Sequence, residues 1–219
     1  MSEIKLVEIK TEIFKENKEK ADVVREMMKS RGTKLVNLMA SPGAGKTSLL
    51  LATIKGLEGV RTGVVEGDIE SFVDSEKIRA AGAPVVQIKT GGACHLDAPM
   101  IIPALEEVEK EAHSDLIFVE NIGNLVCPAE FDIGADKRVM ILSVPEGNDK
   151  VQKYPLMFSV SDVCIINKTD VKDYFDFDFE DFYKRVRALN PDIKIFELSC
   201  KTGEGVAQWL DYVKTDILG

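Results

Sequence analysis

A glycine-rich turn between an apolar strand and a helix is the feature that most constrains the fold of this chain. Residues 35–39 are mainly apolar, residues 41–47 read Ser-Pro-Gly-Ala-Gly-Lys-Thr, and the apolar run 49–51 follows. This layout is typical of a phosphate-binding loop, in which backbone N–H groups surround the phosphates, the lysine neutralises them and the threonine binds Mg²⁺. The alternative is an ordinary strand-to-helix turn that happens to contain Gly-Lys-Thr. Ala40 departs from the usual pattern, which begins with glycine.

The loop therefore predicts a site for a nucleoside triphosphate. Lys46 and Thr47 are the loop residues that we expect to take part in phosphate chemistry. The nucleotide-binding residues expected in the loop are Gly43, Ala44, Gly45, Lys46, Thr47 and Ser48.

Short β-branched runs alternate with amphipathic helical stretches from Lys34 onward. Strands are expected over residues 35–39, 62–65, 85–88, 116–119, 139–143, 163–166 and 193–198. Because helices separate these runs, we predict an α/β fold with a mostly parallel sheet flanked by helices on both faces.

An amphipathic helix is predicted before the sheet. Apolar residues Leu6, Ile9, Ile13, Val24 and Met28 recur at roughly helical spacing, and a glycine at position 32 offers a stop. We expect residues 1–31 to form a helix appended to one domain over residues 32–219. This helix either packs on its own domain or serves as a partner-binding arm.

Composition excludes several classes of function. Lys and Arg total 28 against 37 Asp and Glu, a net charge of −9, which disfavours general nucleic-acid binding. The chain has no apolar run near the roughly 20 residues that span a bilayer, and its start does not resemble a signal peptide. We therefore expect a cytoplasmic protein without nucleic-acid or membrane partners. Its four cysteines are then free thiols or metal ligands.

The motif Asn-Lys-Thr-Asp at residues 167–170 favours guanine as the base. The carboxylate of Asp170 can accept hydrogen bonds from two adjacent donors on the guanine edge, whereas adenine offers no such pair. A second segment, Ser-Cys-Lys, follows the last strand and resembles the Ser-Ala-Lys element that GTPases place beside the base. We therefore predict GTP rather than ATP. The base-site residues are expected to be Asn167, Lys168, Asp170, Ser199, Cys200 and Lys201.

Carboxylates for Mg²⁺ lie between the loop and the base motif. Glu120 ends the strand 116–119, and Gly123 follows it where a backbone N–H could meet the γ-phosphate. Asp68 and Asp74 come after the second strand, and one or both could bind Mg²⁺ or orient the attacking water; the alternative is a helix cap and a solvated helix start. The predicted Mg²⁺ ligands are thus Thr47, Asp68, Asp74 and Glu120, and the predicted catalytic residues are Lys46, Thr47, Asp74 and Glu120.

A thiol and an imidazole stand side by side where the helix after the third strand is expected to open. Cys94 and His95 suit Zn²⁺ or Ni²⁺, although a buried cysteine beside a capping histidine is the alternative. Cys127 lies four residues beyond Gly123, so the segment expected to sense the γ-phosphate carries a second thiol. Three ligands leave a fourth position for water or for a second chain.

The order of these motifs resembles a known family. The segments Ser-Pro-Gly-Ala-Gly-Lys-Thr, Gly-Asp-Ile, Cys-His-Leu-Asp, Glu-Asn-Ile-Gly-Asn-Leu-Val-Cys-Pro, Glu-Gly-Asn-Asp-Lys and Asn-Lys-Thr-Asp are similar to those of the HypB family. This family comprises the nickel-insertion GTPases of nickel–iron hydrogenase maturation. The resemblance implies a P-loop GTPase of the SIMIBI type that hydrolyses GTP with Mg²⁺ and forms a homodimer on GTP or metal binding.

The resemblance also implies a cargo and partners. Ni²⁺ or Zn²⁺ would occupy the site of Cys94, His95 and Cys127 near the dimer interface. Nickel would pass to the hydrogenase large-subunit precursor with the help of a HypA-type metallochaperone. Lys150 and Lys153 would lie at the dimer face, although a solvated helix is the alternative reading of that segment.

Two features of some family members are missing, and three other functions stay open. The chain has neither an N-terminal Cys-x-x-Cys-type nickel motif nor a histidine-rich tract. A urease accessory GTPase is one alternative, but its metal motif is Cys-Pro-His. A GTPase chaperone of a cobalamin-dependent mutase is another, although that task needs no such thiol site. The third is a metal-storage or structural zinc protein with a vestigial nucleotide loop.

Overall fold

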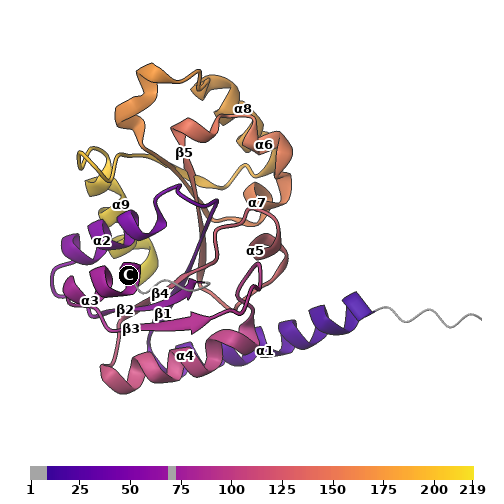
Figure 1. Cartoon of the computed structure of the whole chain (residues 1–219), viewed down its shortest axis with the longest axis vertical. Helices are drawn as coiled ribbons and strands as arrows, with labels where there is room; N and C mark the ends of the chain where they lie inside the picture. The colour runs from indigo at the N-terminus through magenta and orange to yellow at the C-terminus, as the bar shows by residue number, and fades with distance from the viewer. Residues whose placement is uncertain (1–8, 69–72) are drawn as a thin grey trace, which may run out of the picture.

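The computed structural model describes residues 9–68 and 73–219, and for residues 9–11 and 68 it describes the backbone alone. Within these residues a seven-stranded sheet has the order β3-β2-β4-β1-β5-β6-β7 (Figure 1). Every strand pairing in this described sheet is parallel, as the sequence predicted. The strands are β1 (Lys34–Ala40), β2 (Thr62–Asp68), β3 (Val85–Lys89), β4 (Leu116–Glu120), β5 (Lys137–Ser143), β6 (Val163–Asn167) and β7 (Lys194–Glu197).

Helices connect the strands and precede the sheet. The α-helices are α1 (Ile9–Arg31), α2 (Lys46–Gly56), α3 (Val73–Ala80), α4 (Ala98–Glu111), α5 (Cys127–Glu130), α6 (Lys150–Lys153), α7 (Pro155–Val160), α8 (Phe179–Leu189) and α9 (Val206–Tyr212). The shorter or irregular turns are η1 (Val144–Glu146), η2 (Thr169–Tyr174) and η3 (Val213–Leu218).

Both faces of the sheet are covered by helices, as expected for a parallel sheet. On one face, Leu50 of α2, Ile78 of α3 and Trp209 of α9 pack in one apolar cluster with alternate residues of the strands. On the opposite face, α1 and α4 cover one half of the sheet, while α5, α7 and α8 cover the other half. The central strand β1 is therefore buried on both sides, and residues that follow its end are held in a fixed position.

The predicted N-terminal amphipathic helix is present as α1. It contacts α4 and β1, and it buries Ala21, Val24 and Met28 in the cluster beneath them. Ile13, which belongs to the expected apolar stripe, is 48% exposed. Its exposure arises because the first half of α1 extends past the end of α4 (Figure 1). Leu6 lies outside the described residues.

The topology places the candidate site at one edge of the sheet. Strand β1 lies between β4 and β5, but the chain leaves β1 for β2, on the far side of β4, and only later returns to β5. Such a reversal of direction leaves a crevice at the carboxyl ends of the strands, where open α/β sheets bind ligands.

A membrane-spanning helix is absent from the described part of the chain, since none of its helices combines the required length with the required hydropathy.

Candidate functional site

The loop after β1 presents the N-terminus of α2 to a cavity. Gly45 precedes the helix with a φ of 110°, and none of the described side chains caps the helix start. A Cβ at Gly45 would overlap the side chain of Asn167, so this position requires glycine for both its backbone conformation and its space. The cavity, of about 530 Å³, is lined by loop residues that include Lys46 and Thr47. Free N–H groups at a helix start are suited to bind phosphate.

Ala40, which stands where the usual loop pattern has glycine, belongs to strand β1. It is the last residue of the strand, it is fully buried, and it pairs with Ile141 in the β1–β5 register. A strand residue needs no left-handed backbone conformation, so the departure from the pattern places no strain on the loop.

Two of the predicted carboxylates face the hydroxyl of Thr47. Thr47 Oγ1 lies 3.0 Å from Oε1 of Glu120 and 3.2 Å from Oδ2 of Asp74. Asp74 lies in the first turn of α3 and also forms an ion pair with Lys77 at 2.8 Å. Asp68 ends β2, but its side chain lies outside the described residues. The structure thus brings Thr47, Asp74 and Glu120 together on one side of the cavity.

Glu66 joins this group, although sequence reasoning missed it. The β2–β4 register sets Glu66 beside Glu120, and both residues line the same cavity. Glu66 is only 3% exposed and accepts a hydrogen bond from the hydroxyl of Ser75. The available signal was a carboxylate directly after Val64 and Val65, in a strand that is otherwise expected to be buried.

The surroundings of Glu120 fit a bound cation. Burial raises the pKa of Glu120 to about 7, against the lowering effect of Lys46. Oε2 of Glu120 is buried, and among the described residues no hydrogen-bond partner reaches it. Mg²⁺ takes oxygen ligands and would satisfy that atom. The oxygen atoms of Thr47, Asp74 and Glu120 therefore form a donor set that fits Mg²⁺.

A second cavity, of about 440 Å³, adjoins the first across the phosphate loop. Its lining brings together the two segments predicted to hold the base. Asp170 Oδ1 accepts a hydrogen bond of 2.6 Å from the hydroxyl of Ser199, and Asn167 Oδ1 accepts one of 3.2 Å from the backbone N of Cys200. All six predicted base-site residues line this cavity, namely Asn167, Lys168, Asp170, Ser199, Cys200 and Lys201.

The base segment is tied directly to the phosphate loop. Asn167 Nδ2 donates to the carbonyl of Ala44 at 2.9 Å, and Lys168 Nζ donates to the carbonyl of Gly43 at 2.6 Å. Among the described residues Lys168 is the only non-glycine with a positive φ, of 63°. Such backbone strain persists only where surrounding contacts enforce it, and it is concentrated at functional sites. The two cavities therefore share one rigid wall.

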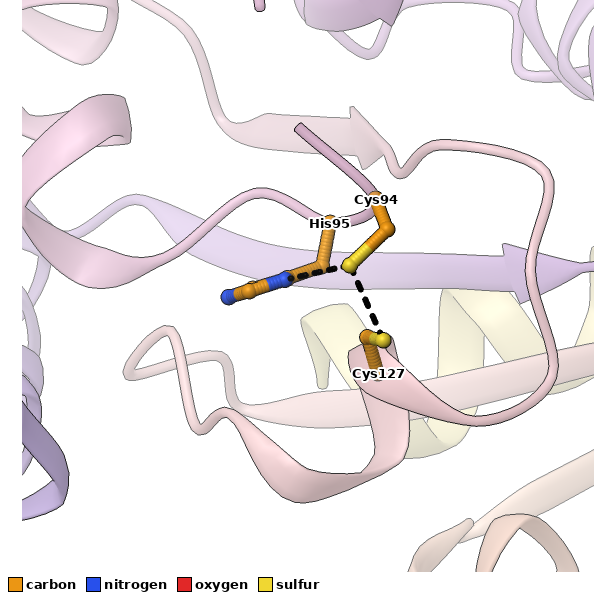
Figure 2. Close-up of side chains that lie close together, drawn as sticks. All are labelled: Cys94, His95 and Cys127. Atoms are coloured by element: carbon orange, nitrogen blue, oxygen red, sulfur yellow. Dashed lines mark hydrogen bonds between the residues drawn. The ribbon is translucent and has the colours of Figure 1, made fainter. Parts of the chain in front are cut away.

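Cys94, His95 and Cys127 form a separate cluster, and none of the three lines either cavity (Figure 2). The two sulfur atoms are 2.9 Å apart, and Cys94 Sγ lies 3.4 Å from Nδ1 of His95. All three ligand atoms lie within 4.8 Å of one another, and both cysteines are free thiols. Sulfur and imidazole nitrogen at this spacing suit Zn²⁺ or Ni²⁺.

The cluster is held by a loop and by a helix start. Cys94 and His95 lie in the loop between β3 and α4, and Cys127 is the first residue of α5. The expectation that Cys94 and His95 open a helix was wrong, because α4 begins only at Ala98 with Asp97 as its cap. A loop leaves the two side chains free to turn toward Cys127.

Protonation at the cluster matters for metal binding. The hydrogen bond with Cys127 raises the pKa of Cys94, whereas burial lowers the pKa of His95. A neutral imidazole is the form that binds metal, while each thiol must lose its proton on binding. Metal binding here is therefore expected to release protons from the thiols.

The segment between β4 and α5 connects the first cavity, which Thr47 and Glu120 line, with the thiol cluster. The backbone N of Asn121 donates to the carbonyl of Leu38 in β1 at 2.9 Å. The side chain of Asn121 accepts from the backbone N of Leu96 at 3.0 Å, and Asn124 Nδ2 donates to the carbonyl of Cys94 at 3.2 Å. One short segment thus contacts both the strand of the phosphate loop and the loop of the thiol cluster.

Gly123, in the middle of this segment, packs on the phosphate loop. It lines the first cavity, which we call the phosphate cavity. A Cβ at Gly123 would lie 2.9 Å from Cγ of Pro42 and 3.0 Å from the backbone N of Pro42. The lack of a side chain allows this close approach. The segment and the phosphate loop are therefore in close contact at Gly123 and Pro42.

Comparison with known sequences gives a family and close relatives. A family model described as "CobW/HypB/UreG, nucleotide-binding domain" matches residues 34–197. The hydrogenase maturation factor HypB of Azotobacter chroococcum is 43% identical over 215 residues, which cover 98% of this chain and 70% of that protein.

Two solved structures share the fold over nearly the whole chain. HypB from Helicobacter pylori in complex with nickel has a TM-score of 0.87 and 37% identity, covering 91% of this chain and 94% of that one. HypB from Archaeoglobus fulgidus has a TM-score of 0.86 and 40% identity, covering 93% of this chain and 99% of that one.

In the metal-free protein we expect Glu120→Gln to stabilise the fold above pH 7. The folded pKa of about 7 exceeds the unfolded value of about 4.3, so wild-type stability falls as the pH rises from about 4.3 to about 7, where the unfolded chain has lost this proton and the folded chain still holds it. Glutamine keeps an oxygen acceptor for Thr47 without the buried charge. The variant's gain in free energy of unfolding should increase by about 1–3 kcal/mol between pH 5 and pH 8.

Denaturant unfolding in the presence of a chelator, at pH 5 and at pH 8, measures this difference. Glu106→Gln, at an exposed position of α4, is the matched control, and we expect its stability to equal that of the wild type at both pH values. A gain for Glu120→Gln that is the same at pH 5 and pH 8 would contradict the assignment.

Proposed function

The chain belongs to the HypB family of hydrogenase maturation factors, and from this premise we propose that it is a GTP-hydrolysing metallochaperone. It would insert nickel into the hydrogenase large-subunit precursor in the cytoplasm, with a HypA-type metallochaperone as partner. The observation that carries the proposal is the position of Cys127. The segment that leads from Glu120 to Cys127 lines the phosphate cavity at one end and completes the thiol cluster at the other.

We assign GTP hydrolysis to the phosphate cavity, which Lys46 and Thr47 line. The side chain of Lys46 and the N-terminal N–H groups of α2 would neutralise the β- and γ-phosphates. Thr47, Asp74 and Glu120 would hold Mg²⁺, with Asp68 as a further candidate, and the bound ion supplies positive charge to the phosphates. The backbone N–H of Gly123 would meet the γ-phosphate. Catalysis of this kind depends on positioning and electrostatic stabilisation rather than on covalent chemistry.

Nickel is the cargo of the thiol cluster, and Zn²⁺ fits the same ligands. We assign control of the cargo to the segment 121–127. When GTP draws Gly123 toward the γ-phosphate, the contact between Asn124 and the backbone of Cys94 would shift the two thiols relative to each other. Loss of the γ-phosphate would reverse the shift. The metal would then have different affinities in the two nucleotide states, which a controlled transfer requires.

A second copy of the chain would complete the metal site. Three ligands leave one position of a tetrahedral site to water or to another chain, and Cys94 is exposed at the surface. We propose that GTP or metal favours a homodimer across this face. Lys150 and Lys153, in the short helix α6, would lie at the same face near the nucleotide.

We expect Asp170→Asn to change the nucleotide preference from GTP toward xanthosine triphosphate. The carboxylate matches the 2-amino group of guanine, whereas an amide matches the carbonyl of xanthine. The ratio of the GTP and xanthosine triphosphate affinities should change by about 100-fold or more. Equilibrium binding of both nucleotides measures this ratio. Asp173→Asn, at an exposed position of the same turn, is the control, and an unchanged preference in Asp170→Asn would remove Asp170 from the base site.

Two variants should separate metal binding from hydrolysis. Cys94→Ala should abolish stoichiometric Ni²⁺ binding and leave GTP hydrolysis largely unchanged, because the thiol lies outside the phosphate cavity. Lys46→Ala should retain metal binding and lose about 100-fold or more in hydrolysis rate, since it removes the charge that faces the phosphates.

Metal analysis and phosphate release on both purified variants test this separation. Cys200→Ala is the thiol control for metal binding. Stoichiometric nickel in Cys94→Ala would refute the ligand assignment. A wild-type protein that neither binds nor hydrolyses GTP would instead favour a metal-storage protein with a vestigial loop.

A further inference from the structure

Helix α1 contacts both chain segments that carry the thiol cluster. The first contact is made by the buried side-chain amide of Asn17. Asn17 is 4% exposed. Its Oδ1 accepts a hydrogen bond of 2.9 Å from the backbone N of Ala98, and its Nδ2 donates one of 2.8 Å to the carbonyl of Asp132. Ala98 follows His95 by three residues, and Asp132 follows Cys127 by five. A single side chain therefore holds the two ligand-bearing segments at a fixed separation.

The second contact is a stack of three aromatic rings. The ring of Phe131 lies on the imidazole of His95 with centroids 3.9 Å apart and an interplanar angle of 27°. Phe14 of α1 in turn contacts Phe131, with ring centroids 4.9 Å apart and ring planes tilted by 33°. The stack runs from α1 to one of the three candidate metal ligands.

Stacking limits how the imidazole can turn. The terminal torsion of histidine is broad, so an isolated ring samples many orientations. In the structure the Nδ1 atom of His95 is directed at Cys94 Sγ, as Figure 2 shows. A flat neighbour at 3.9 Å restricts rotation of the imidazole out of this plane, and the contact with Cys94 Sγ directs Nδ1 toward the thiols. Groups that orient a ligand without touching the metal commonly change metal affinity by about 10–100-fold when they are removed.

A third contact fixes Phe131 through its neighbour. The guanidinium of Arg25 in α1 forms an ion pair with Asp132, and Arg138 binds the same carboxylate at 3.2 Å. The segment after α5 is thus held to α1 at both Phe131 and Asp132.

We propose that Phe14, Asn17 and Phe131 form a positioning group by which helix α1 sets the geometry of the thiol–imidazole metal site. These residues bind no metal themselves; they act through His95 and through the spacing of the two segments. The inference rests on the proposed metal-binding function of Cys94, His95 and Cys127. It adds that the affinity of this site depends on how α1 is seated.

A purely structural role makes a different prediction. Met28 also holds α1 on the domain, since it is 2% exposed in the apolar cluster beneath α4, and that cluster includes none of the three rings. If α1 matters only for stability, then Met28→Ala and Phe131→Ala should have similar effects. If the stack orients His95, only Phe131→Ala should change metal binding.

Co²⁺ titration of the full chain distinguishes these cases. Visible ligand-field bands report coordination geometry, a near-ultraviolet charge-transfer band reports thiolate ligation, and competition with a chromophoric chelator gives the affinity. We expect Phe131→Ala and Asn17→Ala to weaken Co²⁺ binding by about tenfold or more and to alter the visible bands. Phe131→Tyr, which keeps the ring, should restore both. Met28→Ala should lower the thermal unfolding temperature and keep wild-type affinity and bands.

Three results would overturn the proposal, and they are distinguishable. Wild-type affinity and bands in both Phe131→Ala and Asn17→Ala would remove the positioning role while leaving the metal site intact. Equal losses of Co²⁺ affinity in Met28→Ala and Phe131→Ala would show that these contacts act only through the general stability of the fold. If the wild-type chain shows no charge-transfer band, or if its band persists in Cys94→Ala, the proposed metal site is wrong. The inference would then fail together with the proposed metal site.

Discussion

The hydrogen bonds between strand β1 and the segment after β4 are the constraint on which both candidate sites depend. The backbone N of Asn121 donates to the carbonyl of Leu38, and that of Asn124 donates to the carbonyl of Ala40. These bonds carry the sheet pairing beyond the end of β4 and hold residues 121–124 alongside the phosphate loop. Glu120 lies just before this segment and Cys127 just after it. The coupling that we propose between the phosphate-binding cavity and the thiol cluster would act through this segment.

The two candidate sites at the ends of this segment have different ligand atoms and therefore suit different metals. The oxygen atoms of Thr47, Asp74 and the buried Glu120 suit a hard cation, and such a cation would offset the cost of burying the Glu120 carboxylate, which is the same cost that raises its pKa. The exposed thiol of Cys94, with Cys127 and His95, suits a softer metal. An exposed thiol site suits the proposed carrier function, because a cargo metal must be able to leave.

Much of this site could be predicted from the sequence because local motifs fix it. The phosphate loop, the base motif and the acid Glu120 each lie at the carboxyl end of a strand, and parallel strands bring such residues to one edge of the sheet. Glu66 was missed because its pairing with Glu120 depends on the β2–β4 register. Asn17 and Phe131 were missed because their contacts join segments far apart in the chain, with Asn17 115 residues from Asp132. Tertiary packing of this kind leaves no local pattern in one sequence.

The affinity of the thiol cluster for Ni²⁺ in the two nucleotide states tests the central claim most directly. It can be measured by chelator competition on the full chain, with Mg²⁺ and either GDP or a non-hydrolysable GTP analogue. If residues 121–127 couple the phosphate cavity to the cluster, the two complexes will differ in Ni²⁺ affinity or stoichiometry, and Cys94→Ala will bind no stoichiometric Ni²⁺ in either state. Identical affinity and stoichiometry with GDP and with the analogue would contradict the coupling.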